Sequence, residues 1–96
     1  MIHPKLNGYT IIFSKKADKF LDTLDKKTKL SFLKKVRELQ TNSENLNIKK
    51  LKSHHKLYRL RIGDFRAVYS IQHERIIIYI VAIGYRKNIY DHLNFA

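Results

Sequence analysis

The chain contains no cysteine, so a disulfide scaffold and any metal site or nucleophile built on a thiol are excluded. This absence fits the reducing cytosol, and we expect a cytoplasmic location. Residues 1–8 lack the apolar core of a secretory signal peptide. The longest apolar run, residues 76–83, is too short to cross a bilayer, since a spanning helix needs about 20 residues. The sequence therefore predicts a soluble intracellular protein.

Acidic residues are also scarce. The chain has 8 Asp and Glu against 20 Lys and Arg, which gives a formal net charge of +12 over 96 residues. Such an excess favours an anionic partner: nucleic acid first, an acidic protein second and an anionic membrane surface third. The length is enough for one domain, residues 1–96, with a single small core.

The first half of the chain predicts a strand followed by two helices. Residues 9–13 form a short β-type run, and Ser14 can cap the helix that follows. Asp25 is placed to cap a second helix over residues 26–40. The apolar stripes of the two helices are Ala17, Phe20, Leu21 and Leu24, and Phe32, Leu33, Val36 and Leu39. Residues 41–47 predict a loop, and residues 49–56 a basic connector.

The second half predicts three strands joined by tight turns. Residues 58–62 and 65–69 form a hairpin, residues 72–74 a second turn, and residues 75–83 a central strand buried on both faces. Gly84 ends that strand, and residues 88–93 predict a short helical tail. The order β-α-α-β-β-β predicts an α+β fold, in which two N-terminal helices pack on one face of an antiparallel sheet.

The hairpin carries the strongest functional signal. Its strands alternate between apolar and basic residues, so each has one apolar and one largely basic face. Gly63 at the first central position suits a two-residue type II′ turn with Asp64. That register sets Arg61 directly opposite Arg66, an unfavourable pairing of like charges. Together with Arg59, these arginines predict a site that holds a polyanion.

The end of the chain adds a fourth arginine and a phenol. Arg86 and Tyr90 are four residues apart and share a face if a helical turn begins there. Arg86 follows the strand predicted to lie beside that of Arg66. Guanidinium groups bind phosphate bidentately, and a tyrosine can stack on a base. The set predicts a site for single-stranded RNA.

RNA cleavage at such a site needs neither metal nor cofactor, because RNA supplies its own nucleophile, the 2′-hydroxyl. His54 and His55 are adjacent and would point to opposite faces of a strand, so no metal site is expected. We interpret His3, His73 and His92 as solvated side chains.

These segments, in this order, resemble the RelE/ParE superfamily of type II toxins, and its RelE branch in particular. The resemblance covers most of the chain and rests on the strand and helical pair at the start, Lys50-Leu51-Lys52, Tyr58-Arg59-Leu60-Arg61, Phe65-Arg66-Ala67-Val68-Tyr69 and Gly84-Tyr85-Arg86-Lys87-Asn88-Ile89-Tyr90. It implies a toxin that enters the ribosomal A site and cleaves mRNA there, and that a cognate antitoxin neutralises.

The resemblance also implies residue roles. Candidate RNA-binding residues are Lys50, Lys52 and Lys56, and candidate catalytic residues are Arg59, Arg61, Arg66, Arg86 and Tyr90. Arg66 is similar to the residue that clamps the scissile phosphate, and Arg86 to the group near the leaving oxygen. Tyr90 is similar to the aromatic residue that stacks on a base.

Two departures from the family pattern concern the proton acceptor. Arg59 and Arg61 stand where a lysine can appear, and the pKa of arginine, above about 12, makes it a poor base. Tyr85 stands where some relatives carry a histidine. The candidate proton carriers that remain are Lys52, Lys56 and His92.

Two other functions stay open. A ParE-like protein would poison DNA gyrase with the same fold, and an inactive relative would bind RNA without cutting it. In every case the resemblance implies a small acidic antitoxin, which would lie across exposed apolar positions on the helical pair or at the sheet edge.

Overall fold

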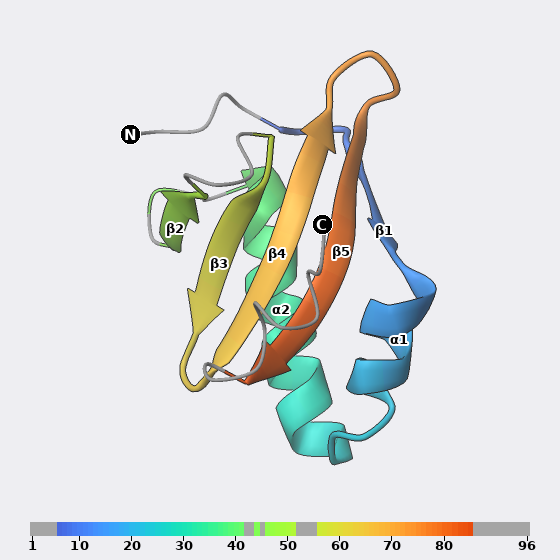
Figure 1. Ribbon diagram of the computed structural model, residues 1–96, viewed down its shortest axis with the longest axis vertical. Helices are drawn as coiled ribbons and strands as arrows, with labels where there is room; N and C mark the ends of the chain where they lie inside the picture. The colour runs from blue at the N-terminus through green and yellow to red at the C-terminus, as the bar shows by residue number, and fades with distance from the viewer. Residues whose placement is uncertain (1–5, 42–43, 45, 52–55, 86–96) are drawn as a thin grey trace.

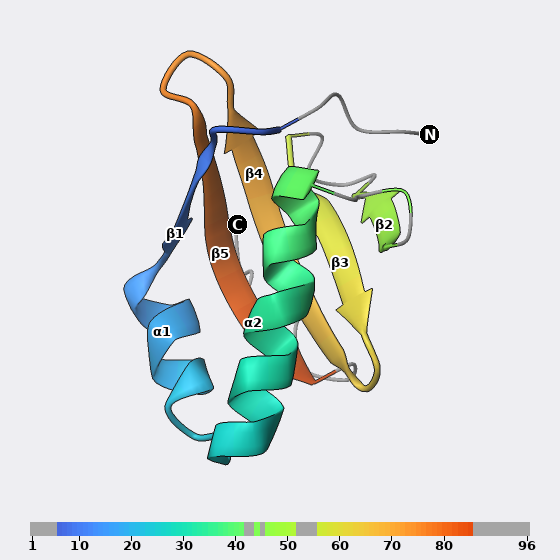
Figure 2. The ribbon, with the colours of Figure 1, turned by 180° about the vertical axis from the view of Figure 1, so that it is seen from behind.

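A computed structural model of the chain describes residues 6–41, 44, 46–51 and 56–85 (Figure 1). The elements in chain order are β1 (Thr10–Phe13), α1 (Lys15–Leu21), α2 (Lys26–Thr41), β2 (Asn47–Lys50), β3 (Tyr58–Ile62), β4 (Phe65–Gln72) and β5 (Ile77–Tyr85). The strands form one sheet in the order β1-β5-β4-β3-β2. Both helices cover the same face of this sheet, as the two opposite views show (Figures 1 and 2). No helix in these ranges is long and apolar enough to span a membrane.

The α+β class and the two helices on one sheet face are confirmed, and two details differ from the sequence prediction. Residues 47–50, predicted as loop and connector, form strand β2, which pairs with β3 and places Ile48 beside Leu60. Strand β1 runs parallel to β5, so the sheet is mixed rather than wholly antiparallel. The predicted helical tail, residues 88–93, lies outside the described residues.

The last strand also differs from its predicted position and bounds. The centre of the sheet is β4, and β5 lies between β4 and β1. Strand β5 starts at Ile77 and continues past Gly84 to Tyr85, because Gly84 pairs with Arg66 and Tyr85 with Phe65. Gly84 therefore does not end the strand. Between Val68 and Tyr69 the β4–β5 register shifts by a β-bulge at Val81.

The helices begin where the sequence predicts. The Ser14 hydroxyl accepts a hydrogen bond from the backbone N–H of Ala17 at 3.0 Å and donates one to the carbonyl of Val81 at 2.6 Å. Helix α1 ends at Leu21, so Leu24 lies in the connection to α2. Ser14 thus caps α1 and ties it to β5.

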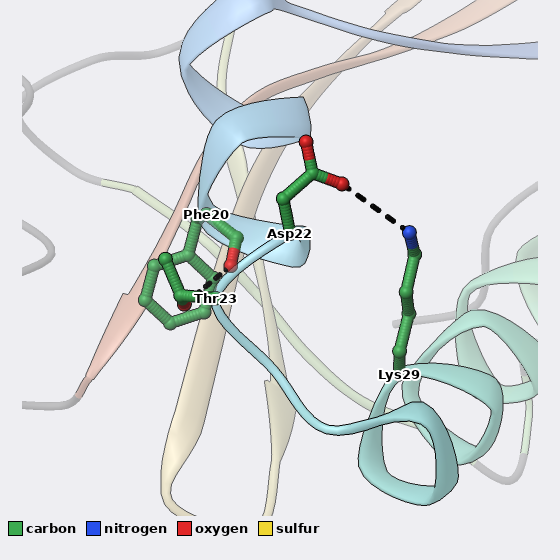
Figure 3. Close-up of polar contacts among 4 residues, drawn as sticks. All are labelled: Phe20, Asp22, Thr23 and Lys29. Carbon is green, nitrogen blue, oxygen red and sulfur yellow. Dashed lines mark hydrogen bonds and ion pairs between the residues drawn. The ribbon is translucent and has the colours of Figure 1, made fainter.

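The connection between the helices is held by polar contacts (Figure 3). Thr23 donates its hydroxyl to the carbonyl of Phe20 at 2.6 Å, and Lys29 reaches Asp22 at 3.4 Å. Lys29 and Asp22 are both well exposed, so their ion pair contributes little beyond local order.

The main core lies between the helices and the sheet. It joins buried side chains of α1, α2, β3, β4 and β5, among them Phe32, Leu60, Tyr69 and Ile80. The ring of Tyr69 stacks on that of Tyr58 with centroids 5.6 Å apart. Burial, and to a smaller degree the neighbouring Tyr58, raises the pKa of the Tyr69 hydroxyl, which therefore stays neutral in the folded protein.

We expect Ser14→Ala to lower the free energy of unfolding by about 2 kcal/mol, because it removes the helix cap and leaves the Val81 carbonyl without its hydroxyl donor. Urea unfolding followed by circular dichroism measures the change. The matched control, Ser31→Ala, removes an exposed hydroxyl on α2 and should change stability by less than about 0.5 kcal/mol. Equal effects of the two variants would contradict the double role of Ser14.

Candidate nucleic-acid interface

Three arginines lie on the sheet face opposite the helices. Side chains alternate along a strand, and cross-strand partners share a face. On β3, Tyr58, Leu60 and Ile62 pack in the helix-side core, which sends Arg59 and Arg61 to the other face. On β4 the core members are Phe65, Ala67, Tyr69 and Ile71, which sends Arg66 to that same face. We name this surface, defined by Arg59, Arg61 and Arg66, the arginine face.

The predicted hairpin register is confirmed. Ile62 pairs with Phe65, and Arg61 pairs directly with Arg66. Gly63 has a φ of 58° and Asp64 is not in the positive-φ region, as a type II′ turn requires. The tight turn therefore fixes two like charges opposite each other.

Arg66 is buried, with 6% of its surface exposed. Its Nη1 donates to the carbonyl oxygens of Gly63 and Phe65, each at 3.0 Å. These two carbonyls belong to the hairpin turn, so the position of the guanidinium is set by backbone atoms. A cation held in this way needs little rearrangement to meet an anion.

Arg59 is anchored at one end of its guanidinium. Its Nη2 donates to Oδ1 of Asn47 on β2 at 2.7 Å. Its Nε is buried and has no hydrogen-bond partner within the described part of the chain. A buried donor without an acceptor costs about 1–3 kcal/mol, and because this N–H is sealed from solvent, its surroundings would have to move before it could meet an oxyanion.

Strand β2 adds a residue that sequence reasoning missed. The β2–β3 register sets Lys49 opposite Arg59 and Lys50 opposite Tyr58. Because cross-strand partners share a face, Lys49 joins the arginine face, whereas Lys50 lies on the other side of the sheet. The signal in the sequence was the alternation of Asn47 and Lys49 around Ile48.

A small apolar cluster adjoins the arginines on the same face. Val68 and Ala82 are buried there, and Leu51, Leu57 and Val81 pack against them. The backbone N–H of Leu51 donates to the carbonyl of Leu57 at 2.9 Å, which extends the β2–β3 pairing over this cluster. The arginine face therefore carries cations at the hairpin-turn end and apolar side chains farther along.

The other predicted site residues fall in two groups. Lys50 and Lys56 line a groove at the opposite end of the β3–β4 hairpin from its turn. Lys52, Arg86 and Tyr90 lie outside the described residues, as do His3, His54, His55 and His92. His73 is exposed, and its Nδ1 lies 2.8 Å from the Tyr9 hydroxyl. The structure thus brings together Arg59, Arg61 and Arg66.

The charges of Arg59 and Arg61 are not balanced by carboxylates within the described part of the chain. Neither Arg59 nor Arg61 forms an ion pair with a described acidic residue, and the ion pairs that α2 makes join Lys29 to Asp22 and Lys35 to Glu38. The described residues contain no group of three metal-ligating side chains. The geometry suits the binding of phosphate groups by guanidinium.

Comparison of the sequence with known proteins gives matches to toxins. The family described as the ParE toxin of type II toxin-antitoxin system, parDE, matches residues 11–90. Toxin RelE3 of Methanocaldococcus jannaschii is 39% identical over 51 residues, which cover 53% of this chain and 56% of that toxin.

Solved structures share the fold. A chain of the RelE–RelB complex from Pyrococcus horikoshii superposes with a TM-score of 0.68 at 29% identity, covering 81% of this chain and 94% of that one. A chain of the RelB–RelE complex from Methanococcus jannaschii gives 0.67 at 26% identity, with 84% and 96% covered. The isolated RelE toxin of E. coli gives 0.66 at 21% identity, with 90% and 95% covered, and shows the fold alone.

The fold is that of RelE chains of known structure. The match over residues 11–90 shows the family: the chain belongs to the ParE toxin family of type II toxin–antitoxin systems, within the RelE/ParE superfamily. The resemblance seen in the motifs is confirmed.

We expect Arg61→Gln to raise the free energy of unfolding by about 0.5 kcal/mol, because it removes the like-charge pair with Arg66. Urea unfolding at low salt measures the gain, which should shrink in about 1 M salt, where the Debye length is about 3 Å. Lys34→Gln, on the exposed side of α2, makes the same change in net charge and should have a smaller effect. A loss of stability in Arg61→Gln would show that the pair is not repulsive.

Proposed function

We propose that this toxin cleaves mRNA in the ribosomal A site, using the arginine face to bind the RNA backbone. The observation that carries the proposal is the placement of three arginines on one face of two adjacent strands, with Arg61 opposite Arg66. A fold selected for stability alone would avoid this arrangement, whereas a site for a polyanion requires it.

In the proposed reaction the 2′-oxygen of one nucleotide attacks the adjacent phosphorus, and the bond from phosphorus to the 5′-oxygen breaks. The products are a 2′,3′-cyclic phosphate, which can hydrolyse to a 3′-phosphate, and a 5′-hydroxyl. Arg66, fixed by the turn carbonyls, would hold the scissile phosphate and stabilise the charge that grows on its oxygens. From the sequence, Arg86 would lie near the leaving oxygen, and Tyr90 would stack on a base.

The position of Lys56 argues against this residue as the proton acceptor. This residue precedes Arg61 by five positions, about 16 Å of extended chain at about 3.3 Å per residue, so it lies far from Arg66. Lys49, beside Arg59, is a described amine on the arginine face. It joins Lys52 and His92, which lie outside the described residues, as a candidate proton carrier.

The test is cleavage of a defined mRNA by the purified protein, with and without programmed ribosomes, mapped by primer extension. We expect cuts in the A-site codon only when ribosomes are present. Arg59→Gln and Arg61→Gln should each slow cleavage by about 100-fold or more, because each removes a donor to the developing charge. Lys34→Gln on α2 is the matched control and should cleave at the parent rate.

Two results would contradict this proposal. One is the absence of any cut from protein shown to be folded by circular dichroism. The other is cleavage by Arg59→Gln and Arg61→Gln at the rate of the control. Arg66→Ala is the less decisive variant, because Arg66 is buried and its removal can also weaken the hairpin turn.

A second candidate is inhibition of DNA gyrase, and the family match to ParE toxins favours it. It predicts growth arrest with intact mRNA and damaged DNA, and no dependence on Arg59 or Arg61. An inactive relative that only binds RNA would show salt-sensitive binding without cuts. The cleavage assay, followed by a gyrase assay on the same protein, separates these outcomes.

We also propose a small acidic antitoxin as the partner, since the structurally similar RelE chains come from complexes with RelB. A groove of about 370 Å³ between α2 and β1 supports it, lined by Ile11, Phe13, Leu33, Val36, Arg37 and Gln40. Apolar walls with one arginine at the rim suit an amphipathic acidic helix or strand.

We expect Leu33→Ser to reduce co-purification of an acidic protein encoded beside this chain, because Leu33 lines the groove. Leu30→Ser makes the same change on the same helix at an exposed position outside the groove lining, and should leave capture intact. Equal capture by both variants, or no acidic partner at all, would remove the groove from the proposed interface.

A further inference from the structure

A groove of about 710 Å³ opens at the end of the β3–β4 hairpin farthest from its turn. It exists because β4 is longer than β3. The pairing of β3 with β4 ends at Tyr58 and Tyr69, whereas β4 continues to pair with β5 as far as Gln72. The three residues of β4 beyond Tyr69 therefore line the groove, together with Tyr58.

The lining is rich in positive charge. Lys50 comes from the end of β2, Lys56 from the connection before β3, and Arg75 from the turn after β4. Glu74 is the one acidic residue among the lining residues, so the groove carries a net positive charge. The exposed His73 adds a ring that can stack on a base, whereas the Tyr58 ring already stacks on that of Tyr69.

The turn over residues 73–76 forms the rim of the groove and is held by contacts with residues that do not line the groove. Ile76 has a φ of 56°, an unusual conformation for a β-branched residue that persists only where the surroundings enforce it. The Ile76 carbonyl accepts a hydrogen bond from Thr10 at 2.9 Å, and the Tyr9 hydroxyl lies 2.8 Å from His73. Two contacts with the segment leading into β1 thus fix the rim before any ligand arrives.

The groove lies at the end of the sheet and is reached from both of its faces: Lys50 and Tyr58 belong to the helix side, whereas two residues of β4 belong to the side of the arginine face. Ser70 and Gln72 line the groove, and by alternation along β4 they share a face with Arg66 and Val68. At about 3.3 Å per residue, Ser70 lies about 13 Å and Gln72 about 20 Å from Arg66 along the strand. Between them lies the apolar cluster, whose partly exposed members Leu51, Leu57 and Val81 offer surface on which bases could pack.

We propose that this groove is a second RNA contact, which holds nucleotides of the same strand several positions away from those at the arginine face. The sequence predicts Lys50 and Lys56 as RNA-binding residues, and in the structure they line this groove together with Arg75 and His73. The inference rests on the proposed function, because it takes RNA as the ligand of the arginine face. Because two residues of β4 line the groove on the side of that face, RNA is favoured over an acidic peptide.

The proposal predicts that the groove matters only for RNA long enough to reach it. Binding to the whole protein is measured by fluorescence anisotropy with 2′-O-methyl RNA, which lacks the nucleophile and is not cut. The probes are about 4 and about 12 nucleotides long, within the range of single-strand sites. The groove variant is Lys56→Gln with Arg75→Gln, and the control is Lys19→Gln with Lys34→Gln on the helices.

We expect the groove variant to bind the long RNA about 10-fold more weakly than the control does. The slope of the logarithm of the binding constant against the logarithm of the salt concentration should become less steep by about 1.4, because each of the two lost phosphate contacts on a single strand contributes about 0.7. For the short RNA the two double variants should be equal. Arg59→Gln should weaken both lengths, which tests the arginine face independently.

Other outcomes separate the two proposals. Equal binding of groove and control variants at both lengths overturns the second contact and leaves the cleavage proposal intact. A groove effect on the long RNA together with no A-site cleavage retains the contact and rejects the nuclease. If the groove variant binds RNA as the control does but no longer captures the acidic partner, RNA is not the ligand of the groove and a protein is.

Discussion

The packing of β4 against the helices determines which way every functional side chain points. Phe65, Ala67 and Tyr69 lie in the helix-side core, and the ring of Phe65 meets that of Phe32 on α2 edge to face with centroids 5.9 Å apart. A slip of one residue in β4 would send these side chains to solvent and Arg66 into the core. The large apolar area that such a slip would expose fixes the register, and with it the arginine face.

The same register creates a conflict that the core must outweigh. It opposes Arg61 to Arg66 and leaves the Nε of Arg59 buried without a partner in the described part of the chain. These features cost about 1–4 kcal/mol together, against a net stability of about 5–15 kcal/mol for a protein of ordinary stability. Natural sequences keep such local violations at functional sites, where a ligand relieves them. The rest of the hairpin has the alternation and turn residues of a stable sheet. The unfavourable placement of these arginines therefore points to a function rather than to a poorly formed hairpin.

The features that could be predicted from the sequence depend on patterns within short segments. The features that were missed depend on which strands pair with each other in the sheet. The alternation around Arg59 and Arg61 and the single Gly63 were enough to predict the hairpin, its turn type and its register. Strand β2 was missed because it has four residues and one apolar side chain, Ile48. Without that strand, Lys49 could not be assigned to the arginine face. The parallel pairing of β1 with β5 crosses most of the chain, and no local pattern records it.

The position of the cations offers a physical reason for the ribosome dependence that we propose. Guanidinium groups supply charge for the transition state, but they are poor proton acceptors. Lys56, a candidate from the sequence, lies in the groove at the far end of the hairpin. Orientation of reacting groups can contribute about 7–11 kcal/mol to a barrier. If both proposals hold, the described residues bring arginines and one neighbouring lysine to the reacting phosphate, and such a protein would gain most from a partner that aligns the 2′-hydroxyl. A programmed ribosome holds its codon in one conformation, so it is suited to supply the order that this face lacks.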